Sequence, residues 1–191
     1  MRSVLLLICW SLMFVVGCDA VRDKLTDADG RPFDLWGNRE KAAATVLIFT
    51  RSDCPISNRY APTVRSLHST YQERGVDFFL IYINPRETSS SIRQHLEEYQ
   101  YPCQGVYDPW HELVKMTGAT VTPEAVVFDA ERKIAYRGRI DDLYVSFGQA
   151  RPAVTTHDLA DALVAVLAGK TVAEPVTKAV GCSIGDLAPR K

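Results

Sequence analysis

The stretch that most constrains the fold is a short apolar run that leads into a Cys-Pro pair. Residues 45–50 read Thr-Val-Leu-Ile-Phe-Thr, which is β-branched, aromatic-rich and too short for a helix. Such a run is typical of a buried strand. Cys54 and Pro55 follow after a short polar turn, and a helical apolar pattern extends from Ile56 to Glu73. The sequence therefore predicts that Cys54 lies where a core strand turns into a helix.

This position favours a reactive cysteine. Unpaired backbone N–H groups at a helix N-terminus stabilise an anion, and the thiolate is the reactive form of cysteine. Pro55 suits the first helical position, where its missing N–H is not needed. Arg51 and Arg59 add positive charge nearby. The alternative is a buried and inert cysteine, which is common among free cysteines.

Two motifs resemble a known family. The strand followed by Cys54-Pro55-Ile56-Ser57 resembles the redoxin branch of the thioredoxin superfamily, which includes AhpC/TSA-type and membrane-anchored thiol–disulfide proteins. Residues 118–129 resemble the segment that carries the superfamily's cis-proline, here Thr122-Pro123, followed by a core strand. The motifs are about seventy residues apart, which suits an intervening βαβ unit. The resemblance implies an α/β thioredoxin-like fold, with a central mixed sheet flanked by helices, an N-terminal β-extension and a C-terminal tail.

The first residues have the pattern of a targeting segment. A charged Arg2 precedes an apolar run from Val4 to Val16 that is too short for a confident membrane span. Val15-Val16-Gly17-Cys18 resembles a bacterial lipobox, whose cysteine becomes a lipidated N-terminus. The alternative is an ordinary secretory signal with a chance cysteine. Both predict a protein outside the cytoplasm, in the cell envelope facing the periplasm or secreted.

These patterns divide the chain into a signal peptide (1–17), a redoxin domain (18–170) and a tail (171–191). Within the domain we expect a second central strand at 76–83, a polar helix at 89–99, a short helix at 111–117, paired strands at 126–128 and 134–137, and a last helix at 157–168. His95 is expected to be solvated, and Asp141 and Asp142 to be solvated or capping rather than metal ligands. The net charge of −1 and the lack of a basic block make nucleic acid an unlikely partner.

The resolving cysteine is not encoded beside Cys54. Thioredoxin-type reductases use Cys-x-x-Cys, but the second position here is Ser57, which cannot form an S–S bond. Cys182, in a Gly-Cys-x-Ile element similar to the ends of some exported redoxin-like proteins, is the leading candidate. Cys103 is second, although a partly buried spare thiol is its better interpretation, and an external thiol is third. A bond between Cys54 and Cys182 is open to either a catalytic or a purely structural interpretation.

The resemblance implies an envelope thiol–disulfide oxidoreductase without cofactor or metal. Cys54 is the expected nucleophile, Cys182 the expected resolver and Arg51 a stabiliser of the thiolate. The expected substrate-binding residues, which line a cleft for protein or small-molecule thiols and disulfides, are Pro55, Ser57, Thr122 and Pro123. Lipidated Cys18 would supply the membrane contact.

Three alternatives remain at this stage. A peroxiredoxin-like thiol peroxidase is one, although Arg51 and Leu47 replace the hydroxyl and proline usual in that motif, and Pro123 occupies a position near which an arginine is usual. A copper-handling protein like the Sco proteins is another, with Cys54 and Cys182 joined by His111 or His157, because soft thiolates and imidazole suit copper. The last is a scaffold in which the two cysteines form a permanent staple.

Overall fold

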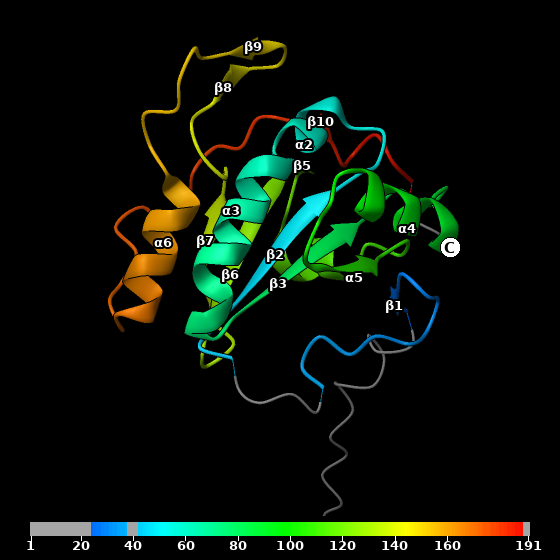
Figure 1. The fold of residues 1–191 in the computed structure, drawn as a ribbon, viewed down its shortest axis with the longest axis horizontal. Coiled ribbons are helices and arrows are strands. Elements are labelled where there is room, and N and C mark those ends of the chain that lie inside the picture. Colours follow the sequence, from blue (N-terminus) through cyan, green and yellow to red (C-terminus); the bar gives the residue numbers. More distant parts are fainter. Residues whose placement is uncertain (1–23, 38–41, 189–191) are drawn as a thin grey trace, which may run out of the picture.

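The computed structural model describes residues 24–37 and 42–188, and its centre is a six-stranded mixed sheet (Figure 1). The strand order is β1-β4-β3-β2-β6-β7, in which β4, β3 and β2 are parallel and β1, β6 and β7 are antiparallel to their neighbours. The expected mixed sheet with flanking helices is confirmed. The predicted signal peptide and Cys18 lie outside the described residues.

The elements follow in chain order. The strands of the main sheet are β1 (Thr26–Asp27), β2 (Ala44–Thr50), β3 (Val76–Tyr82), β4 (Gln104–Tyr107), β6 (Glu124–Asp129) and β7 (Ile134–Gly138). Two small sheets pair β5 (Val121–Thr122) with β10 (Cys182–Ser183), and β8 (Tyr144–Ser146) with β9 (Gln149–Ala150). The helices are α2 (Pro55–Arg59), α3 (Ala61–Tyr71), the 3-10 turn η1 (Gln72–Arg74), α4 (Ser89–Glu98), α5 (Glu112–Thr117) and α6 (Asp158–Leu167).

The central strands are apolar along their whole length because both faces of the sheet are covered. Successive side chains of a strand point to opposite faces, so β2 divides its residues between two cores. Val46 and Ile48 join the core on the side of α3 and α6, whereas Leu47 and Phe49 join the core that contains residues of α5 and of the C-terminal tail. The seven residues of β2 are all buried.

The helix predicted from Ile56 to Glu73 is interrupted just before Pro62. Tyr60 lies between α2 and α3 with φ −81° and ψ −4°, and its N–H bonds to the carbonyl of Ser57. Pro62 has no N–H to donate and its ring crowds the carbonyl four residues earlier, so one continuous helix cannot form. The break leaves α2 as a short helix directly after Cys54.

The C-terminal tail returns across the molecule to the end of the sheet where β2 finishes. Figure 1 shows β10, β5 and α2 together at that end. On the way, Val176 forms a bridge with Arg137 of β7, and further on Ile184 and Leu187 enter the core that contains Leu47 and Phe49. The tail is thus packed along the domain rather than extending from it.

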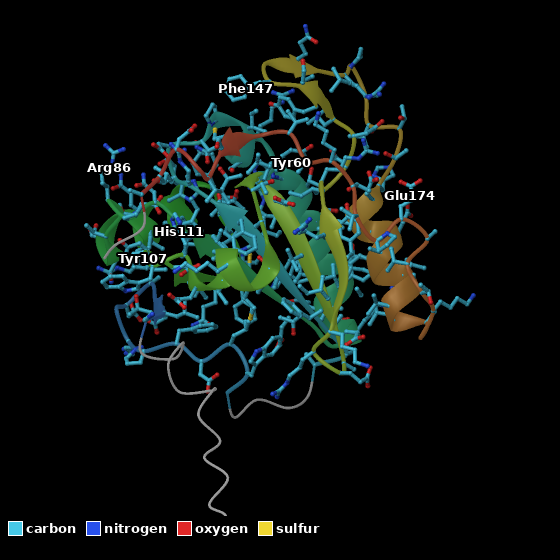
Figure 2. All side chains as sticks on the ribbon, turned by 180° about the vertical axis from the view of Figure 1, so that it is seen from behind. Tyr60, Arg86, Tyr107, His111, Phe147 and Glu174 are labelled. Carbon is cyan, nitrogen blue, oxygen red and sulfur yellow. The ribbon has the colours of Figure 1, made fainter. Side chains whose placement is uncertain are left out.

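The β8–β9 hairpin lies at the top of the molecule in both views, toward the end where β10 and α2 also lie in Figure 1 (Figures 1 and 2). Phe147, labelled in Figure 2, is 67% exposed, and Val145 is 50% exposed. At its base the ring of Tyr144 lies 6.0 Å from that of Tyr60. None of the helices within the described ranges has the length and apolar character that crossing a membrane requires.

Candidate active site

The site is built around two sulfur atoms that come from opposite ends of the domain. Cys54 follows β2 and is the N-cap residue of α2, and Cys182 is the first residue of β10. Their Sγ atoms are 2.6 Å apart. A disulfide bond is about 2.05 Å long, so the two sulfurs need to approach by only about half an ångström to bond. Cys54 is fully buried, whereas Cys182 is partly exposed.

Backbone pairing between the tail and the segment before Pro123 sets this distance. Cys182 pairs with Thr122 and Ser183 with Val121 in an antiparallel ladder, and the N–H of Ile184 donates to the carbonyl of Thr120 over 2.9 Å. Gly181 permits the close approach, because a Cβ there would overlap the carbonyl oxygen of Thr122 and lie 2.6 Å from its carbon. A residue without a side chain is therefore needed immediately before Cys182.

The peptide bond between Thr122 and Pro123 is cis, as the motif predicts. The loop is held by the next residue: Glu124 Oε2 accepts hydrogen bonds from the N–H groups of Thr120 and Val121 at 2.7 and 3.3 Å. Arg137 lies 3.6 Å from the other Glu124 oxygen and donates to two backbone carbonyls just upstream, at Thr117 and Gly118. Hydrogen bonds to Glu124 and from Arg137 therefore hold the backbone around β5, the strand that pairs with β10 of the tail.

The surroundings of Cys54 favour its thiolate. Burial alone raises the pKa of the Cys54 thiol, but interactions with Cys182, with the hydroxyl and backbone N–H of Ser57 and with the Thr122 side chain outweigh burial and lower it. Ser57 Oγ and Thr122 Oγ1 are buried and have no hydrogen-bond partner among the described residues. Protonated Cys54 also has an acceptor in the Thr122 carbonyl oxygen, 3.1 Å from the sulfur.

Cys182 shifts in the opposite direction. Burial, the hydrogen bond to Cys54 and the negative charge of Cys54 raise the pKa of its thiol. The two shifts make Cys54 the first of the pair to lose its proton, with the Cys182 thiol as the hydrogen-bond donor to the resulting thiolate. One sulfur is therefore prepared as nucleophile or leaving group, and the other retains the proton of the pair.

The guanidinium of Arg51 forms an ion pair with Asp53. Its Nε and Nη2 donate to the two carboxylate oxygens of Asp53 at 2.9 and 3.0 Å. This ion pair raises the pKa of Arg51, to which the charges of Cys182 and Cys54 also contribute, so the guanidinium is within electrostatic reach of the sulfurs. Arg51 is thus near the pair as predicted, but Asp53 offsets much of its positive charge.

The substrate-binding residues predicted from the motif differ in their accessibility. Pro55 is exposed at the first position of α2, whereas Ser57 and Thr122 are 2% and 0% exposed. Pro123 is buried beneath Gly181. With the tail in place, Thr122 and Pro123 face this chain's own β10 instead of solvent.

A hydrogen-bonded chain beneath the Cys54 turn was missed by the sequence analysis. His95 was expected to be solvated, which is wrong, because it is only 4% exposed. Its Nδ1 accepts from the Tyr82 hydroxyl at 2.8 Å, and its Nε2 donates to Asn58 Oδ1 at 2.9 Å. Asn58 Nδ2 then donates to the Ser52 carbonyl at 3.0 Å, and burial lowers the pKa of His95 to about 4. Neutral His95 thereby links α4 and β3 to the turn before Cys54.

The buried carboxylates of Asp141 and Asp142 accept hydrogen bonds from nearby side-chain and backbone groups. The Tyr60 hydroxyl donates to Asp141 Oδ1 at 2.7 Å, and the Leu143 N–H donates to the same oxygen at 2.9 Å. Asp142 accepts the N–H groups of Thr155 and Thr156. Both aspartates are 3% exposed and accept N–H groups of loop residues, so the expectation that they are solvated is wrong.

Cys103 and the histidines considered for a metal lie apart from this chemistry. Cys103 is 6% exposed, and burial raises the pKa of its thiol to about 12. His111 is buried and donates from Nε2 to the Ile83 carbonyl at 2.8 Å, and His157 is exposed at the start of α6. Within residues 24–37 and 42–188, no cluster of three or more His, Cys, Asp or Glu side chains is arranged to hold a metal ion.

Comparisons with solved structures find the same fold in other proteins. A structure of an uncharacterised conserved protein from Geobacillus kaustophilus is 31% identical, with a TM-score of 0.73 over 84% of this chain and 86% of that one. A hypothetical protein from Sinorhizobium meliloti is 28% identical, with a TM-score of 0.73 over 84% and 88% of the two chains. A secreted disulfide oxidoreductase from Mycobacterium tuberculosis, described as homologous to DsbE, is 17% identical and shares the fold (TM-score 0.53; 80% and 99% covered).

A comparison with curated proteins gave no match. The sequence model of the Redoxin family matches residues 17–145, which include β2, Cys54, the cis-proline and the central sheet. The match covers well over half of the chain and fits both the motifs and the thioredoxin-like architecture. This chain therefore belongs to the Redoxin family.

Proposed function

We propose that the protein is a thiol–disulfide oxidoreductase whose redox couple is Cys54 and Cys182. The observation that carries the proposal is the 2.6 Å separation of the two sulfurs, in a family whose members are redox proteins. Cys54 acts as the nucleophile because its pKa is lowered, and Cys182 acts as the resolving cysteine.

The reaction begins with attack by the Cys54 thiolate on one sulfur of a substrate disulfide, which releases the other substrate sulfur as a thiolate. The intermediate is a mixed disulfide between Cys54 and the substrate. Cys182 then loses its proton to solvent and attacks Cys54, the bond to the substrate breaks, and the second substrate thiolate leaves. The products are two substrate thiols and a Cys54–Cys182 disulfide, so two electrons pass from protein to substrate.

Substrate access requires movement of the tail. Cys54 is 0% exposed and β10 covers Thr122. In the reduced protein the segment Gly181–Ser183 is held by the short β5–β10 ladder and by a hydrogen bond between the sulfurs, without a covalent bond to Cys54. Lifting the segment Gly181–Ser183 uncovers Cys54, Thr122 and Pro123 together, which gives these residues the substrate-binding role expected from the motif.

Among the remaining predicted residues, Ser57 stabilises the thiolate from its buried position and Arg51 contributes at longer range. The peroxidase alternative is less well supported, because Arg51 occupies the hydroxyl position and is bound to Asp53. The copper alternative lacks a third ligand among the described residues.

The test is disulfide exchange between the reduced full-length chain and oxidised glutathione. Cys54→Ser abolishes protein-disulfide formation while circular dichroism remains unchanged, and Cys182→Ser stops the reaction at a glutathione adduct on Cys54. Cys103→Ser is the matched control and retains the wild-type rate. Unchanged turnover in Cys54→Ser, or an intact second step in Cys182→Ser, refutes the assignment.

We also propose that the chain is an envelope lipoprotein anchored through Cys18, on the basis of the lipobox-like Val15-Val16-Gly17-Cys18. Expression in a bacterial host followed by fractionation tests this. Cys18→Ser moves the protein from the membrane fraction to the soluble fraction, and Cys9→Ser, within the same leader, leaves it in the membrane fraction. An equal distribution of wild type and Cys18→Ser contradicts the anchor.

A further inference from the structure

The two cysteines of the couple differ in their access to solvent. Cys54 is 0% exposed, closed off by Thr122, α2 and the tail, whereas Cys182 retains an exposed surface. Because the sulfurs are already 2.6 Å apart, forming the bond between them requires little movement of the tail. In the oxidised protein, Cys182 is consequently the sulfur that an external thiol meets first.

The tail is held on the upstream side of Cys182 by hydrogen bonds to β7. The N–H of Arg137 donates to the Pro175 carbonyl at 2.9 Å, and the N–H of Thr177 donates to the Arg137 carbonyl at 3.1 Å. The Thr177 hydroxyl is 2.6 Å from the hydroxyl of Tyr136, which is 1% exposed. These contacts fix the tail before it reaches the site.

On the downstream side the tail is held by apolar burial. Ile184 and Leu187 are 4% and 8% exposed within the second core, and removing such apolar side chains from water stabilises the packed tail. The Ile184 N–H also bonds to Thr120. A Cys54–Cys182 bond adds a covalent point between the two anchors, so the place beside β5 is closed to another peptide strand in the oxidised state.

We propose that the immediate reductant of the Cys54–Cys182 disulfide is a small-molecule monothiol that attacks Cys182, and not a protein dithiol that pairs its backbone with β5. The inference rests on the proposed function, for which it names the class of electron donor. A small thiol reaches Cys182 with the tail in place, whereas a protein partner has to displace a strand that is anchored on both sides and covalently bonded between.

The leaving-group chemistry of the two cysteines also favours attack on Cys182. A thiolate RS⁻ attacks Cys182 Sγ, the S–S bond breaks and its electron pair goes to Cys54, which the site stabilises as a thiolate. Exchange is faster when the leaving thiol has the lower pKa. A second RS⁻ attacks the R sulfur of the mixed disulfide, and Cys182 leaves and takes a proton from solvent. Two monothiols are oxidised to one disulfide RSSR, and the protein disulfide is reduced to its dithiol.

The first experiment maps the mixed disulfide in the wild-type full-length chain. The protein is oxidised, mixed with glutathione or 2-mercaptoethanol, quenched with acid at short times and digested for mass spectrometry. We expect the thiol adduct on Cys182 to exceed that on Cys54 by at least about tenfold. A predominant adduct on Cys54 overturns the inference, and this measurement needs no variant.

The second experiment loosens the downstream anchor. In Ile184→Ala/Leu187→Ala, reduction of the disulfide by a thioredoxin accelerates at least about tenfold, because the tail lifts and β5 becomes available, whereas reduction by 2-mercaptoethanol changes by less than about threefold. Val176→Ala is the matched control, since it truncates an apolar tail residue that is 62% exposed, and it leaves both rates unchanged. Equal thioredoxin rates in wild type and the double variant overturn the inference.

Failure of the proposed function and failure of this inference would give different experimental results. If Cys54 and Cys182 are not a redox couple, oxidised glutathione does not produce the Cys54–Cys182 disulfide in the first place. If only the inference fails, the disulfide forms and is reduced, but through Cys54 or by protein dithiols without loosening of the tail.

Discussion

Replacing Gly181 with alanine tests whether backbone pairing of the tail is what brings the two sulfurs together. An added Cβ would overlap the Thr122 carbonyl oxygen, and real Cβ atoms stay at least 3.0 Å from such neighbours. The obstacle is backbone, so it cannot rotate aside as a flexible side chain can. We therefore expect β10 to withdraw from β5 by roughly an ångström.

The expected magnitude follows from what that withdrawal breaks. The two residue pairs of the β5–β10 ladder are disrupted, and backbone hydrogen bonds contribute about 0.5–1.5 kcal/mol each. A loss of about 2 kcal/mol lowers the equilibrium constant for Cys54–Cys182 disulfide formation roughly thirtyfold. The anchors at Thr177 and Ile184 remain, so the tail stays near the domain and the core is unaffected.

The assay is a redox titration of the full-length chain in mixtures of reduced and oxidised glutathione, with the disulfide quantified by mass spectrometry. Gly185→Ala is the matched control, because a Cβ at that position meets only the Ser183 hydroxyl at 3.5 Å. We expect a wild-type constant for Gly185→Ala. A wild-type constant for Gly181→Ala, or an equal loss in both variants, refutes the reasoning.

Three further predictions concern the support of the site. Because His95 has a pKa of about 4 in the folded chain against 6.5 when unperturbed, the unfolded state binds its proton first as the pH falls. Between pH 7 and pH 4 the free energy of unfolding of the wild type should therefore fall by about 2–3 kcal/mol more than that of His95→Gln, as measured by urea titration. An identical pH dependence in the two proteins would contradict a buried neutral His95. Tyr60→Phe removes a hydrogen bond to the buried Asp141 carboxylate and should cost about 1.5–3 kcal/mol in the same assay, whereas no measurable loss would show that the bond is absent in solution. Ser57→Ala should raise the pKa of Cys54, followed by the ultraviolet absorbance of the thiolate, more than Arg51→Ala does; the reverse order would assign the stabilisation to the guanidinium.

Much of the fold was predictable because the signals are local. The apolar runs of β2 and β3 identify buried strands, and Gly75 and Gly118, at φ 78° and 71°, end their helices in the left-handed conformation that glycine adopts readily. The family resemblance placed the cis bond at Thr122-Pro123 correctly. In each case neighbouring residues in the sequence are sufficient to determine the conformation.

The contacts that the sequence did not reveal join distant segments. His95 lies on a polar helix and shares its buried face with Ile92, and its partners Tyr82 and Asn58 belong to β3 and α2. Such side-chain networks leave no periodic pattern in the sequence. The ladder between β10 and β5 is similarly hidden, because each strand has two residues. Gly181 before Cys182 was the available signal, but its meaning depends on the Thr122 carbonyl that it approaches.

The exposure of the two cysteines also could not be foreseen. In the sequence Cys54 has all the features of the attacking residue, and Cys182 is one cysteine in a tail without strong hydrophobic periodicity. The packing of Ile184 and Leu187 places the tail over Cys54 and leaves Cys182 partly exposed. This arrangement distinguishes the reduced state, in which the tail can lift, from the oxidised state, in which a covalent bond holds it.

The most direct test of the account is disulfide mapping of the full-length chain produced in an oxidising compartment, by mass spectrometry before and after mild reduction. The account predicts a Cys54–Cys182 bond that mild reductant opens readily, with Cys103 free in both samples. Free Cys54 and Cys182 in the oxidised sample, or a bond from Cys54 to Cys103, would contradict it.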